Sequence, residues 1–441
     1  MTNKHLIGKQ VLLLHTDRQK NAFALQQQFC DTYRRAIVPA MERLFDRLSG
    51  PELYIRLDKV EIDLCIISPK DLCSDALAER IAEQLEKWIG VNLENVPGAS
   101  VKTQAIHLFE QWLYWLEHGT MPESGTTPES GWLEHVLQNL GLEPHAVEQL
   151  HALLSTRPVA LRRLVLQHDS MFLQTLVELF TGHKQAMLPR FIALFHTVQQ
   201  HATAKLSSPP FRQLEIAYWT EIIKITMLKR EKLPATSLIA AVQADASIAM
   251  LLSPFVKIIT SEKVYSNEPL ARLILKPRNS RQQTKTEKVT ENEPSVKVKV
   301  EKELTPAPEN CFIENAGIVL IHPFLPRFFT KLDLLDGNHF KDENARHKAV
   351  VLLHYLATGL PSTPDYNLVL PKLLCDMPIN LSIDHYLTPD KAELEAADDM
   401  LFAAIEHWEV LGNTSPDGLR EGFLQRSGKL EMVSGARRLQ I

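Results

Sequence analysis

The segment Asn315–Phe329, NAGIVLIHPFLPRFF, restricts the possible folds of this chain more than any other stretch. It joins apolar and aromatic side chains to two prolines, and it contains one arginine and no acidic residue. Such a segment is not stable as a solvated loop, so we expect it to be buried in its own domain or against a partner. Two prolines fix the local backbone, which reduces the entropy lost when a neighbouring aromatic side chain docks. The candidate partner or core anchors are His322, Pro323, Phe324, Leu325 and Pro326.

Length and composition predict where the folding units begin and end. At 441 residues the chain exceeds what one hydrophobic core usually supports, so two or three domains are expected. Residues 277–310 mix Lys, Arg and Glu with Thr, Pro and Gln and contain no aromatic residue. That composition cannot bury enough apolar area to order itself, which predicts a disordered linker. We therefore predict a domain at 1–95, a helical region at 101–270 and a C-terminal domain at 311–441.

The first 95 residues are predicted to form a small α+β domain in the order strand, helix, strand, helix. Residues 5–14 become apolar toward their end, which suits a short strand. Apolar residues at three- and four-residue spacing from Ala22 to Leu48 predict one long helix, which Pro39 should bend. Alternating apolar residues over 53–66 change phase at Asp58–Lys59, which predicts a strand pair or one bulged strand.

The rest of the chain is predicted to be mainly helical. Residues 101–270 give short helices of unequal length, separated by prolines and without a fixed period, so a regular repeat solenoid is not supported. Asp342 is predicted to be the N-cap of a helix in the C-terminal domain, and further helices are predicted to start at Thr388–Asp390 and at Ser415–Pro416. After Gly428 the sequence predicts a strand and the start of a second one. The expected fold class is therefore mainly α with α+β end domains, and the C-terminal domain ends in a short strand.

Charge and cysteine usage exclude several classes of protein. The formal net charge of -5 gives no overall attraction to nucleic acid or to acidic lipid. The five cysteines are widely spread and contain no Cys-x-x-Cys pair, which predicts reduced thiols in a cytoplasmic compartment and no zinc site. No signal peptide and no membrane span is expected from the apolar runs.

No set of residues indicates a reaction centre. The seventeen histidines lack the spacing of metal ligands, and ordinary partly buried histidines are expected at His322, His354 and His407. Residues 422–429 resemble a phosphate loop only superficially, and a helix cap at Gly428 is favoured. We therefore expect no catalytic, metal-binding or cofactor-binding residues and no enzyme. A structural or interaction role remains.

Several strings carry a resemblance to a known family. In the C-terminal part they are NAGIVLIHPFLP (315–326), LLHYLATG (352–359), LVLPKLLC (368–375) and HWEVLGNTSPDGLREGFLQR (407–426). Near the N-terminus IRLDKVEIDL (55–64) also matches. With these strings the chain resembles the tape measure proteins of contractile injection systems, which are bacterial phage-tail-like particles with a sheathed tube and a spike. Asn413, within the last string, is added to the candidate anchors.

The resemblance implies a non-enzymatic assembly protein that helps to set the length of the inner tube. It implies tube, spike or baseplate proteins as partners, with no nucleic acid and no membrane span. It also implies a cytoplasmic protein that later lies within the assembled particle. The alternative is a chaperone or cargo-loading adaptor for the same particle. The family continues past the strand at 439–441, so the C-terminal domain of this chain is expected to be incomplete.

Overall fold

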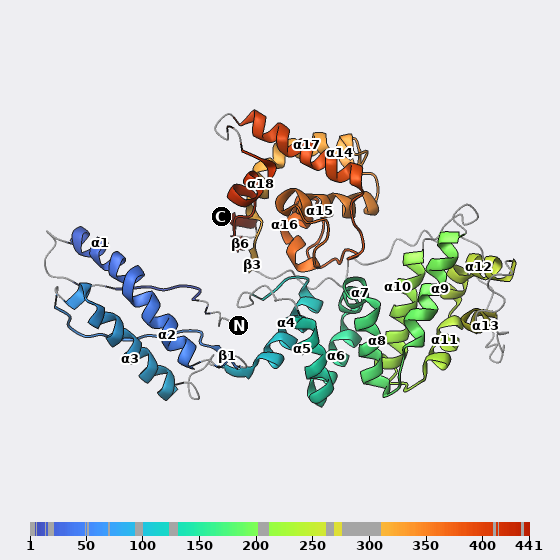
Figure 1. Ribbon diagram of the computed structural model, residues 1–441, viewed down its shortest axis with the longest axis horizontal. Helices are drawn as coiled ribbons and strands as arrows, with labels where there is room; N and C mark the ends of the chain where they lie inside the picture. The colour runs from blue at the N-terminus through green and yellow to red at the C-terminus, as the bar shows by residue number, and fades with distance from the viewer. Residues whose placement is uncertain are drawn as a thin grey trace. The chain divides into compact units, whose positions relative to one another are not determined.

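The computed structural model of the protein describes residues 5, 7–13, 15, 22–48, 50, 53–68, 71–92, 100–122, 131–201, 211–261, 269–275, 310–408, 412, 414–433 and 436–441 (Figure 1). The chain divides into two compact units, Met1–Glu110 and Gln111–Ile441. The predicted fold class is confirmed, because the described residues are mainly helical, with small sheets toward both ends of the chain. The predicted linker lies, up to residue 309, outside the described residues.

The first unit is built around two long helical segments. α1 (Ala22–Thr32) continues through a π-helical turn (Tyr33–Ile37) into α2 (Val38–Leu48), and α3 (Asp75–Asn92) packs against them. The regular hydrogen bonding changes directly before Pro39, where the sequence predicts a bend. β1 (Leu53–Arg56) pairs antiparallel with β2 (Ser100–Thr103).

The strands of this unit differ from the prediction. The described residues between 7 and 13 form no strand, and of the predicted strand at 53–66 only β1 forms one. Its partner β2 was not indicated by the sequence. Val60, Ile62 and Leu64 pack against the helical core of the unit. In an extended segment successive side chains point to opposite sides, so alternate residues can pack on the helices just as they would pack under a half-buried strand.

The first part of the second unit is a helical region in which successive helices lie side by side (Figure 1). α4 (Gln104–His118) crosses the boundary between the two units. The helices that follow it are α5 (Trp132–Leu142), α6 (Pro144–Thr156), α7 (Pro158–Gln167), α8 (Ser170–Thr181), α9 (Met187–His201), α10 (Phe211–Ile223), α11 (Ala235–Gln243), α12 (Ala246–Ser261) and α13 (Pro269–Leu275). Pro144 and Pro158 are the first residues of α6 and α7, where their missing N–H is tolerated. Among the described residues no single helix has the length and apolarity to cross a membrane. The pair α11 and α12 meets both criteria together, but it is bent by 98°.

The second part, here called the C-terminal lobe, comprises the described residues from Asn310 onward. Its helices are α14 (Leu325–Lys331), α15 (Glu343–Thr358), α16 (Val369–Leu374), α17 (Lys391–His407) and α18 (Pro416–Leu419), with 3-10 segments η6 (Ala316–Phe324) and η7 (Asp365–Leu368) and a π-helical turn η9 (Arg420–Leu424). An antiparallel sheet in the order β3 (Asn310–Ile313), β6 (Gly428–Val433), β7 (Ala436–Gln440) confirms the predicted strands after Gly428. A two-residue hairpin pairs β4 (Leu335–Asp336) with β5 (His339–Phe340).

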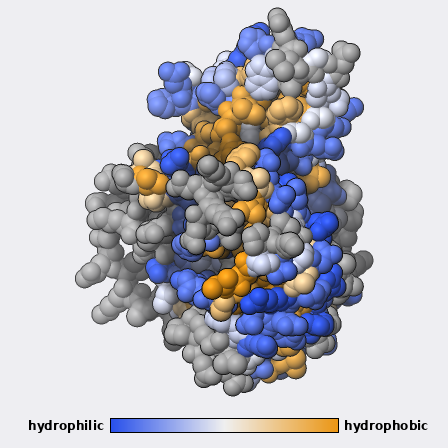
Figure 2. Space-filling model, turned by 90° about the vertical axis from the view of Figure 1, so that its left-hand side faces the viewer, coloured by the Kyte–Doolittle hydropathy of each residue, from blue (hydrophilic) through white to orange (hydrophobic). Residues whose placement is uncertain are grey.

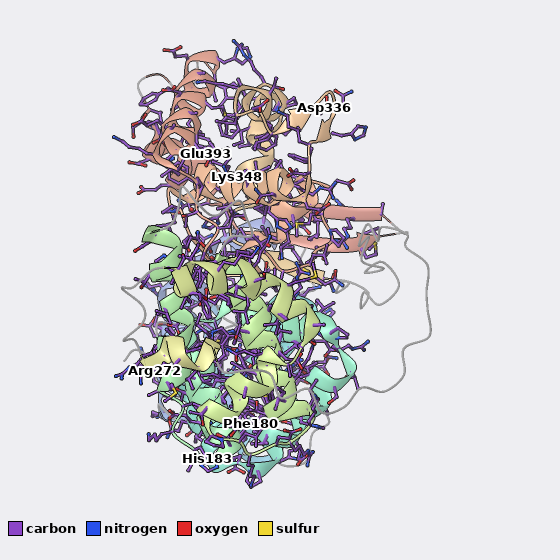
Figure 3. All side chains as sticks on the ribbon, turned by 90° about the vertical axis from the view of Figure 1, so that its right-hand side faces the viewer. Phe180, His183, Arg272, Asp336, Lys348 and Glu393 are labelled. Atoms are coloured by element: carbon purple, nitrogen blue, oxygen red, sulfur yellow. The ribbon has the colours of Figure 1, made fainter. Side chains whose placement is uncertain are left out.

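The predicted helix starts of the lobe are confirmed. The side chains of Asp342, Asp390 and Ser415 each accept a hydrogen bond from a backbone N–H of the first turn that follows. At α17 the arrangement is a capping box, because Glu393 also accepts from the N–H of Asp390. Glu393 is in addition paired with Lys348 of α15 (Figure 3).

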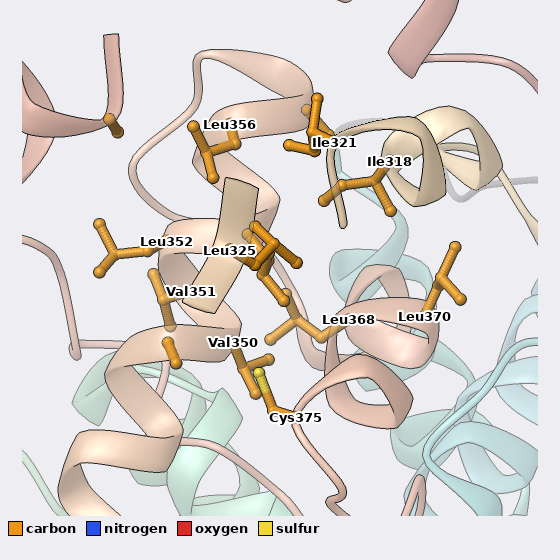
Figure 4. Close-up of a cluster of buried hydrophobic side chains, with 14 of the residues drawn as sticks. Ile318, Ile321, Leu325, Val350, Val351, Leu352, Leu356, Leu368, Leu370 and Cys375 are labelled. Carbon is orange, nitrogen blue, oxygen red and sulfur yellow. The ribbon is translucent and has the colours of Figure 1, made fainter. Parts of the chain in front are cut away.

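The lobe has a hydrophobic core of its own. The apolar segment identified in the sequence contributes Ile318, Ile321 and Leu325, which meet Leu352 and Leu356 of α15 (Figure 4). The described buried residues of this core lie between positions 311 and 430, so no described side chain of the helical region belongs to it. The lobe therefore holds its hydrophobic packing by itself.

Two glycines allow close approaches in this lobe. A Cβ at Gly317 would lie 1.8 Å from the carbonyl oxygen of Phe423, so only glycine lets η6 approach η9. The predicted helix cap at Gly428 is wrong, because Gly428 is the first residue of β6. A Cβ there would meet the Cβ of Ala316 at 2.6 Å and the carbonyl oxygen of Gln440 at 2.8 Å, which explains the glycine by strand packing.

Candidate functional site

The described residues contain no group of three or more His, Cys, Asp or Glu side chains that could hold a metal ion. Of the histidines named above, His354 is buried and His322 and His407 are exposed. Burial lowers the pKa of His354 to about 4, because desolvation disfavours the imidazolium. This histidine is therefore neutral at physiological pH, and it lies within α15 beside Thr358.

The candidate anchors are placed differently from one another. Leu325 is buried in the core of the lobe, whereas His322, Pro323 and Pro326 are exposed. Phe324 is half-buried, and its ring meets His407 and Trp408 edge-on, with ring centroids 5.7 and 6.0 Å away. Asn413 lies outside the described residues. A partner contact at Phe324 stays a prediction.

Exposed apolar side chains are dispersed over several elements. Among the described residues of the second unit they include Leu142 of α5, Met171 of α8, Met250 of α12 and Phe402 of α17. Figure 2 shows one face of the molecule, on which hydrophobic residues reach the surface between hydrophilic ones. Single exposed apolar residues are normal in folded proteins and do not define a site.

A buried group of charges was not predicted from the sequence. Arg163 of α7, Asp365 of η7 and Lys372 of α16 have side chains with an exposed fraction of 0%. We call these three residues the ionic junction, because Arg163 belongs to the helical region and the other two to the lobe. Charged side chains are seldom buried this completely unless they are paired.

Hydrogen bonds account for the charges of the ionic junction. The Nε of Arg163 donates to Oδ2 of Asp365 at 3.1 Å, and its two terminal nitrogens donate to the carbonyl oxygens of Leu116 and Asn380. The Nζ of Lys372 lies 2.5 Å from Oδ1 of Asp365 and donates to the carbonyl oxygen of Ile379 at 3.0 Å. One carboxylate thus lies between two cations, and backbone carbonyls accept from both terminal nitrogens of Arg163 and from Nζ of Lys372.

Burial dominates the electrostatics of this group. It lowers the pKa of Lys372 to about 8, against the attraction of Asp365, which favours the charged form. Burial also lowers the pKa of Arg163, again opposed by Asp365. Two cations share one carboxylate, so Asp365 is the residue on which both charges depend.

A second set of contacts surrounds the ionic junction. Arg212 of α10 donates from two nitrogens to the two carboxylate oxygens of Asp384, each at 2.8 Å, and its guanidinium lies 4.5 Å from the ring centroid of Tyr386. This bidentate geometry is the strongest form of the arginine–carboxylate contact. Residues 384–386 are therefore held against α10.

Backbone groups also cross between the two parts. Gln167 of α7 donates to the carbonyl oxygen of Ile383 at 2.6 Å and accepts from the backbone N–H of Asp365 at 2.8 Å. The N–H of His385 donates to the carbonyl oxygen of Leu166 at 3.1 Å. These bonds fix the register between α7 and the lobe, since each joins a single donor to a single acceptor.

The end of α4 approaches the same place. Gly119 adopts φ +78°, and a Cβ there would lie 2.7 Å from a terminal nitrogen of Arg163 and 2.9 Å from the carbonyl oxygen of Ile379. Glycine is thus required both by the backbone conformation and by the space. The sequence did contain a signal for the ionic junction. Arg163 and Lys372 each stand among apolar residues of a helix, where a charged side chain must find a buried partner.

The comparison with protein families decides the identity of the chain. The family model described as contractile injection system tape measure protein matches residues 4–441. The chain belongs to this family. The match includes the first unit, the helical region and the lobe, so the resemblance seen in the terminal strings is confirmed. No curated protein and no solved structure matches the chain.

Proposed function

We propose that this tape measure family protein is a non-enzymatic assembly component that helps to set the length of the inner tube of a contractile particle. The observation that carries the proposal is the family match over residues 4–441. The proposed partners are tube, spike or baseplate proteins, first in the cytoplasm and then within the particle.

The folded structure limits how a ruler could work. As one continuous helix the 441 residues would span about 660 Å at ~1.5 Å per residue. The helical region instead consists of short helices packed side by side, and hydrogen bonds hold the lobe against α7 and α10. A length-setting role therefore requires that the chain opens before or during tube growth.

Paired changes in the helical region test the proposal. Deletion of residues 132–156, which form α5 and α6, removes about 40 Å of helix, and duplication of the same residues adds the same length. A ruler predicts shorter tubes for the deletion and longer tubes for the duplication, measured by electron microscopy of assembled particles. The duplication is the control for damage to the fold, because a merely damaged chain cannot lengthen a tube.

Two other outcomes have defined meanings. Tubes of unchanged length with both variants would exclude the ruler. Tubes of normal length that lack cargo would favour the adaptor.

A further inference from the structure

The helical region and the lobe each keep a separate apolar core. The core of the lobe contains only residues between 311 and 430. In the helical region Phe195, Trp219 and Phe255 are buried on α9, α10 and α12. Among the described residues the core of the lobe includes no side chain of the helical region, so separation of the two parts does not divide that core. Residues 276–309, outside the described part of the chain, connect them covalently.

The surface between the two parts is rich in charges and polar groups. The ionic junction, the Arg212–Asp384 pair and Gln167 carry most of its specific contacts, and Tyr366 of the lobe adds an edge-on ring contact with Trp115 at 5.4 Å. When both partners of a buried ion pair enter water together, each regains its hydration, so separation costs little net electrostatic free energy. Polar inter-domain surfaces of this kind behave like transient interfaces.

We infer that the ionic junction is a latch, which docks the lobe on α4, α7 and α10 in the free protein and opens when the chain enters the particle. The inference rests on the proposed function, because a chain that measures a tube cannot keep its lobe folded back on the helical region. The hydrogen bonds to single carbonyl oxygens set one docked arrangement. Asp365 and Lys372 both belong to the lobe, so undocking separates Arg163 from Asp365 and leaves the Asp365–Lys372 pair together.

A disulfide across the surface tests the latch in the full chain. The N–H of His385 bonds to the carbonyl oxygen of Leu166, which brings the two backbones side by side. The double variant Leu166→Cys with His385→Cys places two thiols on these hydrogen-bonded backbones, and loss of free thiol is measured to establish that the disulfide has formed before particles are counted. Oxidised chain should support at least about tenfold fewer particles of normal length than the same chain after reduction. The reduced form is the matched control, and equal particle numbers from both forms would overturn the latch.

Hydrogen exchange in the free protein gives a second measurement that needs no particle. Arg212→Ala should speed exchange at the amides of Asp365 and His385 by about tenfold or more, while amides inside α17 keep their rates. Glu221→Ala removes a pair with Lys224 outside the junction and is the control, with no change at either amide. Equal acceleration in α17 would show that the lobe unfolds instead of undocking, and the inference would be wrong.

The failure of the latch can be told apart from the failure of the proposed function. If the deletion and duplication of residues 132–156 change tube length but oxidised chain assembles normally, the latch is wrong and the ruler stands. If neither changes tube length, the ruler is wrong, and the requirement that the latch opens in the particle falls with it.

Discussion

Replacement of Asp365 by asparagine is the most direct test of how the second unit is held together. Asp365→Asn keeps the shape of the side chain and removes its charge. Arg163 and Lys372 then remain buried, with carbonyl oxygens and the new amide as their neighbours. We expect the variant to weaken the docking of the lobe, because an uncompensated buried charge is far less stable than the pair.

The magnitude follows from the protonation of the two cations. Removing one partner of a buried ion pair costs about 3–5 kcal/mol. Lys372, with its pKa already lowered to about 8, loses its proton once the attraction of Asp365 is gone, which adds about 1–2 kcal/mol at pH 7. Arg163 stays charged, since a guanidinium does not lose its proton near neutral pH, so it contributes most of the cost.

Hydrogen exchange at individual amides measures this cost. The amides of Asp365 and His385 should lose about three to five decades of protection, or all protection if wild-type opening is cheaper than that. Glu148→Gln is the matched control, because its pair with Arg230 is 58% and 59% exposed and should be worth about 0–1 kcal/mol. Adding Lys372→Met should recover part of the loss. The reasoning is refuted if Asp365→Asn changes protection no more than Glu148→Gln does.

Three further predictions concern acid stability, packing and the linker. Nε2 of His168 accepts from the indole N–H of Trp112 at 2.9 Å, and burial lowers the pKa of this histidine to about 4. Its contribution to the free energy of unfolding is therefore complete above pH 6.5, and up to about 3 kcal/mol of it is lost as pH falls toward 4. His168→Gln should remove that part of the pH dependence, measured by urea unfolding between pH 4 and 7. Gly317→Ala should destabilise the protein by at least about 3 kcal/mol, whereas Gly422→Ala, with open space around the new Cβ, should leave its melting nearly unchanged. Limited proteolysis should cut first within residues 277–310, and a first cut within α17 would contradict the predicted domain boundaries.

Local signals in the sequence predicted much of the lobe correctly. Asp342, Asp390 and Ser415 cap helices because a short polar side chain can satisfy the N–H groups of a first turn, and that chemistry is independent of the rest of the fold. The burial of Ile318 and Ile321 likewise follows from the apolar character of their segment. Such features depend only on neighbours in the chain.

The errors arose where a pattern has two physical solutions. Alternation at Val60, Ile62 and Leu64 suits a strand in a sheet, but it also suits a segment packed on helices, and the structure shows the second. The ionic junction could not be predicted for a different reason. Arg163 and Asp365 are 202 positions apart, and nothing local to either residue indicates its partner. Only the docked arrangement of the two parts brings them together.

The separate cores and the polar surface between them suggest an order for the opening of the chain. Release of the lobe exposes charges that water solvates well, and the connecting residues 276–309 could then span at most about 110–120 Å when fully extended. Straightening of the helical region is far more costly, because it would expose Phe195, Trp219 and Phe255, and burial of each large apolar side chain is worth about 1.5–3 kcal/mol. The undocking of the lobe should therefore precede any extension of the helical region. A ruler built in this way needs the particle, or its growing tube, to stabilise the extended helices, since the free chain gains nothing from exposing them.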